Sequence, residues 1–414
     1  MRSLLISIGV AALLLSPAGA IPQNFGGVGD GGGFFGAVAP PRSIDEDKTG
    51  ELIAATLWQD NELPREWKDV PSLDGDEVKL LSVAPILFGE RPQAVFANLQ
   101  DGRVRSVSAL YLDAGSHFGY KPGKADIKTL QREFKKRYAH LDEVLSKSLA
   151  TKSKRRPKDT SVGRTAFLRT TYQDYLHEDL TLRYSAIEGH SISVTILRSE
   201  ETAEDYLDGE IAALDRRDRR EALIANVEKK PGGDTTIEGV PMFRQGMRPY
   251  CAISTLGMAT HYLGLRMGTD ALAAGARFRS NGSAKGAKIL DLYRAAAAEA
   301  GASIQRGGSF DFERAKKAID KGFPVIVWRR YSSERDRLHS AAARGAQLPE
   351  VQADDRERWP ISKEAPGHAS VVTGYNSETG EVIFSDSWGE HARGKRMLAE
   401  EMEATSYGVF YFKI

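Results

Sequence analysis

A single thiol is the first candidate for chemistry in this sequence. Cys251 is the only cysteine among 414 residues, and it closely follows Pro249 at the start of CAISTLGMATHYLG, a stretch with helical apolar spacing. A helix start presents unpaired N–H groups and a partial positive charge, which together stabilise a thiolate. The position therefore predicts a reactive nucleophile. The alternatives are a small buried hydrophobe or a crosslink between molecules.

A nucleophilic thiol needs a base within hydrogen-bond reach, and the chain has eight histidines. His261 would lie about 15 Å along the same helix as Cys251, which is too far. His368 begins an apolar strand in PGHASVVTGYN, and Gly367 leaves room beside it. His368 is therefore the candidate base. The other histidines fall in an N-terminal region or in polar, loop-like segments: His117, His140, His177, His190, His339 and His391.

A carboxylate is expected next to His368. The strand that begins there turns at residues 376–380 and returns as EVIFSDSWG, which predicts an antiparallel hairpin. In such a hairpin His368 and Asp386 should be nearly opposite, allowing a shift of one or two residues. An aspartate in that position fixes the tautomer of a histidine and stabilises its charged form. The alternative is a surface histidine with an unrelated aspartate nearby.

Gln245 is the candidate oxyanion donor. Attack on an amide needs hydrogen-bond donors aimed at the developing negative charge. The backbone N–H of Cys251 could supply one donor, and Gln245, six residues upstream in VPMFRQGMRPYC, could supply the second. A glutamine in a loop is more commonly just a polar surface residue, and this alternative stays open.

The first residues have the composition of a secretory signal peptide. MRSLLISIGVAALLLSPAGA has a positive Arg2, an apolar run too short to span a bilayer, and a small-residue cleavage site. We expect residues 1–20 to be a signal peptide and residues 21–43, rich in Gly and Pro, to be a flexible tether. The protein should then be secreted or periplasmic, without integral membrane association. A buried N-terminal helix is the alternative.

The remaining chain is long enough for two domains. Residues 44–225 combine helical and alternating patterns, including hairpin signals at Asp101-Gly102 and Gly189-His190, and predict an N-terminal α+β domain. Residues 226–236 contain Pro231-Gly232-Gly233 and are the candidate linker. Residues 237–414 read as helices followed by antiparallel strands, which predicts a second α+β unit with two lobes. Residues 332–364 form a polar insertion before His368, either a cover for a cleft or a surface loop.

Taken together, these motifs resemble papain-like cysteine peptidases. The likeness is to the stand-alone relatives of the double-glycine leader peptidases, which process bacterial export peptides such as bacteriocins. It rests on VPMFRQGMRPYCAISTLGMATHYLG, PGHASVVTGYN and SDSWG, and it covers about residues 234–414. The family's transporter-fused members carry an ATPase loop that this chain lacks, so no ABC transporter domain is expected.

The resemblance implies a papain-like two-lobed fold, a helical lobe plus an antiparallel sheet, for residues 237–414. It implies that Cys251 is the nucleophile, His368 the base, Asp386 the orienting acid and Gln245 the oxyanion donor of peptide-bond hydrolysis through an acyl-enzyme. Trp388 would match the family's tryptophan beside the acid, with plain core packing as the alternative. Gly232-Gly233 would be a candidate site of self-processing.

Several functional alternatives stay open from the sequence alone. The same triad could transfer an acyl group to an amine, as a transglutaminase-like enzyme does. The fold could serve as a non-catalytic binding protein, or the chain could be an unrelated exported protein with a buried cysteine. The expected partner is a peptide or protein substrate. A net charge of +1 gives no reason to expect nucleic acid, and neither a cofactor nor a metal site is expected.

Overall fold

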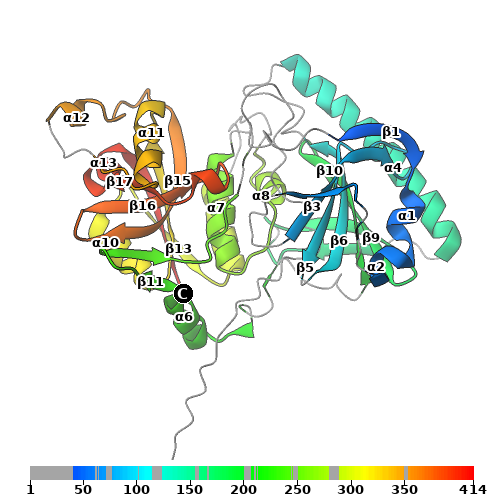
Figure 1. Ribbon diagram of the computed structural model, residues 1–414, viewed down its shortest axis with the longest axis horizontal. Helices are drawn as coiled ribbons and strands as arrows, with labels where there is room; N and C mark the ends of the chain where they lie inside the picture. The colour runs from blue at the N-terminus through cyan, green and yellow to red at the C-terminus, as the bar shows by residue number, and fades with distance from the viewer. Residues whose placement is uncertain are drawn as a thin grey trace, which may run out of the picture.

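The computed structural model describes most of the chain after residue 40 (Figure 1). The described residues are 41–60, 63, 65–70, 77–100, 102–113, 124–153, 158–165, 167–199, 207–208, 211, 213–243, 245, 250–278, 289–348 and 353–414. The expected signal peptide and nearly all of the expected tether lie outside them. Within these residues no helix has both the length and the apolar composition required to cross a bilayer.

An eight-stranded antiparallel sheet organises the N-terminal unit, defined here as residues 41–199 (Figure 1). The long helix α4, Lys124–Ser153, packs on it through Leu130, Phe134, Leu141 and Leu145, one apolar stripe of an otherwise basic helix. The strands run in the order β2 (Trp67–Val70), β3 (Glu77–Leu81), β5 (Ala94–Gln100), β6 (Arg103–Asp113), β10 (Ser191–Arg198), β9 (Leu180–Ile187), β8 (Thr170–His177) and β7 (Lys158–Val162).

Short elements precede this sheet, and its hairpins follow the sequence signals. β1 (Arg42–Asp47) pairs in parallel with β4 (Val83–Ile86), and α1 (Thr49–Ile53) and α2 (Ala55–Asp60) follow β1. The expected hairpins β5–β6 and β9–β10 both form, with Gly102 and Gly189 at positive φ in their turns. Asp101 lies outside the described residues.

The C-terminal unit, residues 207–414, is built on a second eight-stranded sheet. Its main path is β11 (Val227–Lys229), β12 (Asp234–Ile237), β15 (Gly367–Asn376), β14 (Val325–Arg330), β18 (Ser406–Lys413) and β13 (Ser303–Gly307), with β16 (Glu381–Asp386) and β17 (Lys395–Leu398) added beyond β15. Its helices are α6 (Arg216–Ala225), α7 (Cys251–Tyr262), α8 (Thr269–Gly275), α9 (Ile289–Glu299), α10 (Phe312–Ile319), α11 (Ser333–Ala342), α12 (Ala353–Glu357), α13 (Ala399–Thr405) and the 3₁₀ turn η2 (Glu390–Ala392).

Helix α7 is the central helix of this unit and begins at Cys251. Ten of its twelve residues, from Ile253 to Tyr262, are buried, because the helix lies between the sheet and the other helices. It contacts β14 and β15 on one side and α8 and α9 on the others. Its N-cap residue, Tyr250, makes no side-chain hydrogen bond to the helix start. The first turn therefore keeps backbone N–H groups at the position of the thiol.

The expected linker at 226–236 is wrong in the structure. These residues form the hairpin β11–β12, and Asp234 to Thr236 pair with β15 of the C-terminal sheet. Gly232 and Gly233 both have positive φ and form the turn between the two strands. Linkers and tight turns share a polar, Gly-rich composition, so composition alone does not distinguish a hairpin from a linker.

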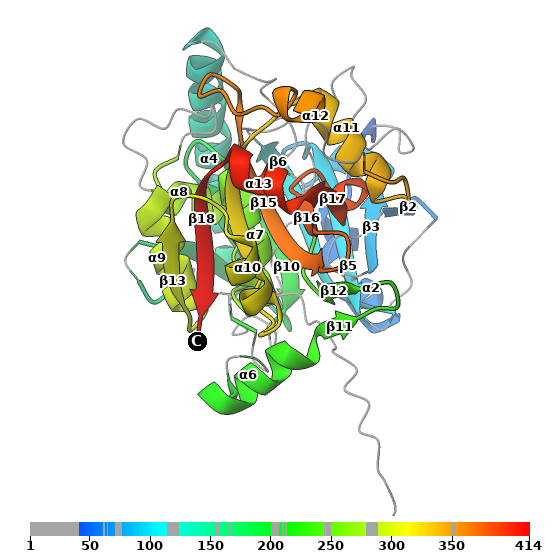
Figure 2. The same cartoon turned by 90° about the vertical axis from the view of Figure 1, so that its left-hand side faces the viewer.

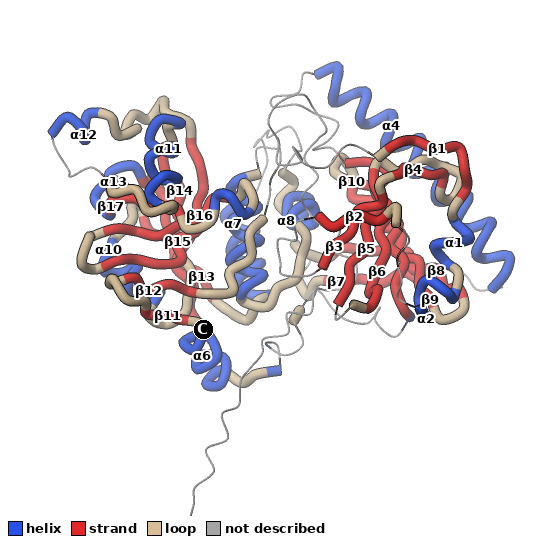
Figure 3. The backbone as a smooth tube through the Cα atoms, viewed as in Figure 1, coloured by secondary structure: helices blue, strands red, loops and turns tan. Residues whose placement is uncertain are grey.

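The expected end of the N-terminal domain at residue 225 also falls too late. Helix α6 belongs to the C-terminal unit: Leu223 is part of its core, and the Arg219 guanidinium donates hydrogen bonds to the carbonyls of Leu263 and Ala300. Most residues of α6 are charged and most are exposed, so its sequence offers little indication that this helix packs on the C-terminal unit. Residues 332–364, expected as either a cover for a cleft or a surface loop, include the helices α11 and α12 (Figure 3).

The two units touch along α7 and α8, which lie between the two sheets (Figures 1 and 2). Helix α8 contacts β9 of the N-terminal unit. Glu299 accepts a hydrogen bond of 2.5 Å from the backbone N–H of Thr165. This hydrogen bond is half-buried, so it is more than a contact between solvated surface groups.

Gly322 offers a test of how tightly α6 packs on the C-terminal unit. Its φ is +75°, and an added Cβ would lie 2.1 Å from the carbonyl oxygen of Leu223 in α6. We expect Gly322→Ala to destabilise the protein by about 2 kcal/mol or more, because backbone strain adds to the clash. Gly380→Ala is the matched control: its φ is +69°, but nothing lies within 4 Å of the added Cβ.

Urea unfolding followed by circular dichroism measures both variants. The control should lose only about 1 kcal/mol, the cost of a positive φ without Cβ contacts. Equal losses for the two variants would mean that α6 does not pack against Gly322 as described.

Candidate active site

Cys251 is the first residue of α7, and its side chain is half-buried rather than sealed. His368 is the second residue of β15 and is buried. The thiol of Cys251 and the ring of His368 are close enough that each shifts the pKa of the other. The backbone N–H groups of Ala369, the residue after His368, and of Ala252 also lower the pKa of the thiol. The helix start and the strand start therefore meet at one point.

Asp386 ends β16 and reaches the same histidine. Its Oδ1 lies 3.0 Å from Nε2 of His368. In the strand pairing Asp386 is opposite Ser370, two residues beyond His368, and the one-residue register shift between Val372 and Gly374 brings it one position closer to His368. Residues two apart share one face of a strand, so the aspartate still meets the ring. With Nε2 on the carboxylate, Nδ1 is the ring nitrogen left for the thiol.

The Asp386 carboxylate is fully buried and surrounded by donors. Oδ1 also accepts a hydrogen bond of 2.6 Å from the Ser370 hydroxyl, and Oδ2 accepts one of 2.9 Å from Nζ of Lys395. Nη2 of Arg329 lies 3.6 Å from Oδ2, and its Nε donates to the Ser370 hydroxyl at 3.0 Å. Arg329 and Lys395 are themselves buried. Three strands, β14, β15 and β17, therefore supply the groups that compensate this charge.

Helix α11 is tied to this cluster by Asp336. Nζ of Lys395 bridges Oδ2 of Asp386 and Oδ1 of Asp336, the latter at 2.8 Å. A second buried ion pair holds the same helix, where Arg335 binds both oxygens of Glu401 on α13 at 2.9 and 2.5 Å. The polar insertion, expected as either a cover for a cleft or a surface loop, thus takes part in the charge balance of the site.

Aromatic rings cover the His368 imidazole. The Trp388 ring lies 4.7 Å from it at an interplanar angle of 30°, and Tyr331 lies 5.6 Å from both rings. Nζ of Lys395 sits 4.3 Å from the centre of the Trp388 ring, a cation–π contact. The layer of rings limits the access of water to the histidine–aspartate pair.

Burial and charge act in opposite directions on the three titrating groups. Burial raises the pKa of the Cys251 thiol, but the hydrogen bond and charge of His368 outweigh it and leave the pKa below its ordinary value. Burial lowers the pKa of His368, whereas the Asp386 charge and the contacts with Asp386 and Cys251 raise it to about 9. Burial also opposes ionisation of Asp386, yet His368, Lys395 and Arg329 hold its pKa well below the usual range. The site favours a thiolate beside an imidazolium.

Gln245 is anchored next to the same strand end. Its backbone N–H donates to the carbonyl of Ser387 at 2.8 Å, and its side-chain Oε1 accepts from the Ser387 hydroxyl at 2.7 Å. Ser387 directly follows Asp386. The amide oxygen of Gln245 therefore faces Ser387, next to Asp386.

Several residues near the site were not anticipated from the sequence. Lys395 and Met397 both lie on the buried face of β17. A lysine at a position where the strand pattern predicts an apolar side chain was the one sequence signal that could have identified Lys395. His339, expected in a polar loop, is instead fully buried on α11 with its Nε2 3.1 Å from Glu401. His190 of the N-terminal unit reaches Tyr250, the residue before Cys251, with Nδ1 2.6 Å from its hydroxyl.

The described residues contain no group of three or more side chains suited to hold a metal ion. Two cavities in the described part of the chain lie elsewhere, along α6 and the end of β18.

Comparison with known proteins points to one family. Residues 237–412 match the family model described as Peptidase_C39 like family. No curated protein matches the chain significantly. Two solved structures are similar at low levels. A candidate C39-like peptidase from Bacillus anthracis is 16% identical, with a TM-score of 0.29, and the match covers 44% of this chain and 98% of that one. Xylellain, a cysteine protease from Xylella fastidiosa, is 14% identical, with a TM-score of 0.25 and coverage of 47% and 88%.

The family match confirms the resemblance that the motifs indicated. The C-terminal part of this chain is similar to C39-like cysteine peptidases, with mixed helices and an antiparallel sheet. The matched residues include Cys251, His368 and Asp386. The N-terminal unit lies outside the match.

The thiol–imidazole pair predicts an unusual pH profile of cysteine reactivity. Because the pKa of the Cys251 thiol is lowered, the thiolate forms at a lower pH than in free cysteine, and it keeps its partner until His368 deprotonates near pH 9. The measured quantity is the ratio of the iodoacetamide alkylation rate at pH 6 to the rate at pH 9. We expect this ratio to be at least about tenfold higher for the protein than for free cysteine. Cys251 is the only cysteine, so mass spectrometry reads it directly.

The His368→Ala variant separates the two causes of that profile. Without the imidazolium, only the backbone N–H groups of Ala252 and Ala369 oppose the effect of burial, so the apparent thiol pKa should rise well above its wild-type value. A wild-type profile that coincides with free cysteine, or one that His368→Ala leaves in place, would contradict the pairing.

Lys395 and Asp336 should move this profile in opposite directions. The charged groups facing Asp386 are Arg329, His368 and Lys395, with Asp336 behind Lys395. Lys395→Met removes a positive charge, so the pKa values of both the thiol and the imidazole should rise by about 0.5–1 unit. Asp336→Asn removes a negative charge, and both should fall by a similar amount.

The double variant and a matched control test the electrostatic origin. Lys395→Met with Asp336→Asn should return close to the wild-type profile, because the two charges cancel. Glu334→Gln on the exposed face of α11 makes the same charge change as Asp336→Asn and should leave the profile unchanged. Shifts of the same sign in both single variants would indicate general disruption instead.

Proposed function

We propose that this chain is an exported cysteine peptidase that hydrolyses peptide bonds with Cys251, His368 and Asp386. The observation that carries the proposal is the arrangement of thiol, imidazole and buried carboxylate, in which Asp386 lies 3.0 Å from the His368 ring and that ring lowers the pKa of the Cys251 thiol. The family match of residues 237–412 supports the same reaction class. The apolar N-terminal stretch of the sequence supports export.

The reaction follows from the arrangement of these groups. The Cys251 thiolate attacks the carbonyl carbon of the scissile bond, and the backbone N–H of Cys251 and the Gln245 amide donate hydrogen bonds to the oxyanion. His368 gives its Nδ1 proton to the leaving amine, which departs and leaves a thioester on Cys251. His368 then takes a proton from water, whose oxygen attacks the thioester and releases the acid. Asp386 holds the ring and stabilises its charged form throughout.

The domain organisation of the proposed enzyme has two parts. We assign residues 237–414 to a papain-like peptidase unit in which α7 and its neighbouring helices form one lobe and the antiparallel sheet forms the other. Cys251 then comes from the helical lobe, and His368 and Asp386 come from the sheet lobe. The N-terminal α+β unit adds the contact from His190 to Tyr250, next to the nucleophile.

Self-processing at Gly232-Gly233 is less favoured by the geometry. Peptidases of this class need their substrate extended, whereas these glycines form a tight turn. The Asn376 side chain donates a hydrogen bond of 2.7 Å to the Gly232 carbonyl, and a Cβ at Gly233 would lie 3.0 Å from Asn376 Oδ1. We expect the two units to remain joined.

Peptide-library digestion tests the proposed activity. Cys251→Ala should abolish cleavage. Asp386→Asn should lower kcat by about 10²- to 10⁴-fold, because the histidine loses its anionic partner. Gln245→Ala should lower kcat by about 10²- to 10³-fold with little change in the alkylation profile of Cys251, since it acts on the oxyanion and not on the thiolate.

Two results would count against a peptidase. Cleavage that survives Cys251→Ala would assign the activity to another group or to a contaminant. Transfer of the acyl group to a labelled amine in preference to water would favour the acyltransferase alternative.

A further inference from the structure

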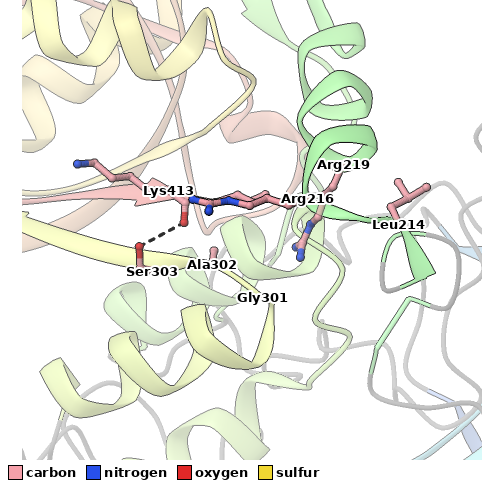
Figure 4. A pocket seen from close by; sticks show the side chains of 8 residues that line it. Leu214, Arg216, Arg219, Gly301, Ala302, Ser303 and Lys413 are labelled. Atoms are coloured by element: carbon pink, nitrogen blue, oxygen red, sulfur yellow. Dashed lines mark hydrogen bonds between the residues drawn. The ribbon is translucent and has the colours of Figure 1, made fainter.

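Two adjoining cavities lie at the end of the C-terminal sheet away from Cys251. They measure about 430 and 710 Å³ and share Arg216, Ser303, Lys413 and Ile414 in their walls. Figure 4 shows the smaller cavity. Helix α6 and the last residues of β18 line both cavities, and helix α10 lines the larger one. We call the two together the α6–α10 groove. A volume of this order is typical of ligand sites in proteins.

The strand register places this groove far from the proposed catalytic site. Arg329 of β14 pairs with His368 of β15 and with Ser406, the first residue of β18. Lys413 is the last residue of β18, and it lines the groove. Strands rise about 3.3 Å per residue, so the groove is more than about 20 Å from His368. It is therefore a separate feature of the molecule.

Positive charge dominates the larger cavity. None of its lining residues is an aspartate or a glutamate. The cations come from three different elements, with two on α6, three on or just after α10 and one on β18. They are Arg216, Arg220, Arg314, Lys317, Lys321 and Lys413.

Most of these cations have no carboxylate partner within the described structure. No described carboxylate lies within 4 Å of the side chains of Arg216, Lys317, Lys321 or Lys413, whereas neighbours on the same helices are paired. Arg217 on α6 binds Glu221 at 3.0 Å, and Lys316 on α10 binds Glu313 at 3.0 Å. Glu221 and Glu313 thus pair with cations outside the groove, and the four cations inside it keep their charge without a described carboxylate partner. Such a field attracts an anionic partner.

Aliphatic side chains add a second recognition element. Leu214 and Ile224 are 37% and 48% exposed and line the two cavities. Aromatic faces on which nucleobases could stack are not offered here, because the Arg314 guanidinium covers the Tyr411 ring at 3.9 Å and Phe323 and Phe412 are buried. Cations combined with exposed aliphatic groups match a polypeptide that carries both carboxylates and apolar side chains.

We propose that the α6–α10 groove binds an acidic polypeptide segment with interspersed apolar residues. The carboxylates of the segment pair with Arg216, Lys317, Lys321 and Lys413. Its apolar side chains rest on Leu214 and Ile224. The proposal does not depend on peptidase activity, since none of these residues belongs to the catalytic series.

Fluorescence anisotropy with a labelled twelve-residue peptide of alternating Glu and Leu pairs, (EELL)₃, tests this binding on the full chain. At 50 mM salt we expect saturable binding that weakens at least about tenfold at 300 mM salt, because screening reduces the charge contacts. Lys317→Ala with Lys321→Ala should weaken binding about tenfold or more. Ile224→Ala should weaken it about threefold or more through lost apolar contact.

Matched controls distinguish the groove from general positive charge. Arg217→Ala with Lys316→Ala removes the same net charge from the same two helices but outside the groove, and it should change affinity less than twofold. Equal loss in both double variants would overturn the proposal, as would absence of peptide binding at 50 mM salt. Tighter binding of a single-stranded oligonucleotide that competes with the peptide would also overturn it, in favour of a nucleic-acid site. Unchanged alkylation of Cys251 shows that each variant is folded.

Discussion

The burial of one carboxylate constrains the whole C-terminal unit. Asp386 is 0% exposed, and an uncompensated charge in that position would cost several kcal/mol. This cost is comparable to the total free energy of unfolding of a domain. The compensation comes from β14, β15 and β17 together, through Arg329, Ser370, His368 and Lys395. The strand order of the sheet is therefore tied to the chemistry, since moving any of these strands would leave a buried charge without its partner.

The same constraint explains why α11 is docked where it is. Arg329, Lys395 and the His368 imidazolium carry three positive charges, and Asp386, Asp336 and the Cys251 thiolate carry three negative ones. Without Asp336 the thiolate form would leave the buried cluster with excess positive charge. The helix that supplies Asp336 is itself fixed by the buried pair of Arg335 and Glu401. An insertion in the sequence is thus an electrostatic component of the proposed site.

The parts of the site that the sequence predicted are those governed by local rules. A helix start identified Cys251, and the symmetry of one hairpin linked His368 to Asp386 to within two residues, since Asp386 pairs with Ser370. Lys395 and Arg329 depend on which strands lie beside that hairpin, and a single sequence does not reveal strand order. The linker prediction at 226–236 failed for a related reason, because the pairing of β12 with distant β15 decides its structure. The roles of the four site residues stay a prediction.

Tyr250 connects the N-terminal unit to the start of the helix that carries Cys251. This residue is fully buried, precedes Cys251, and its hydroxyl lies 2.6 Å from His190 at the start of β10. Because backbone N–H groups at the start of α7 stabilise the thiolate, the orientation of that first turn matters to its charge. A hydrogen bond from another unit to the residue before the turn restricts that orientation. The unit outside the family match is therefore structurally coupled to the thiol rather than attached by a tether alone.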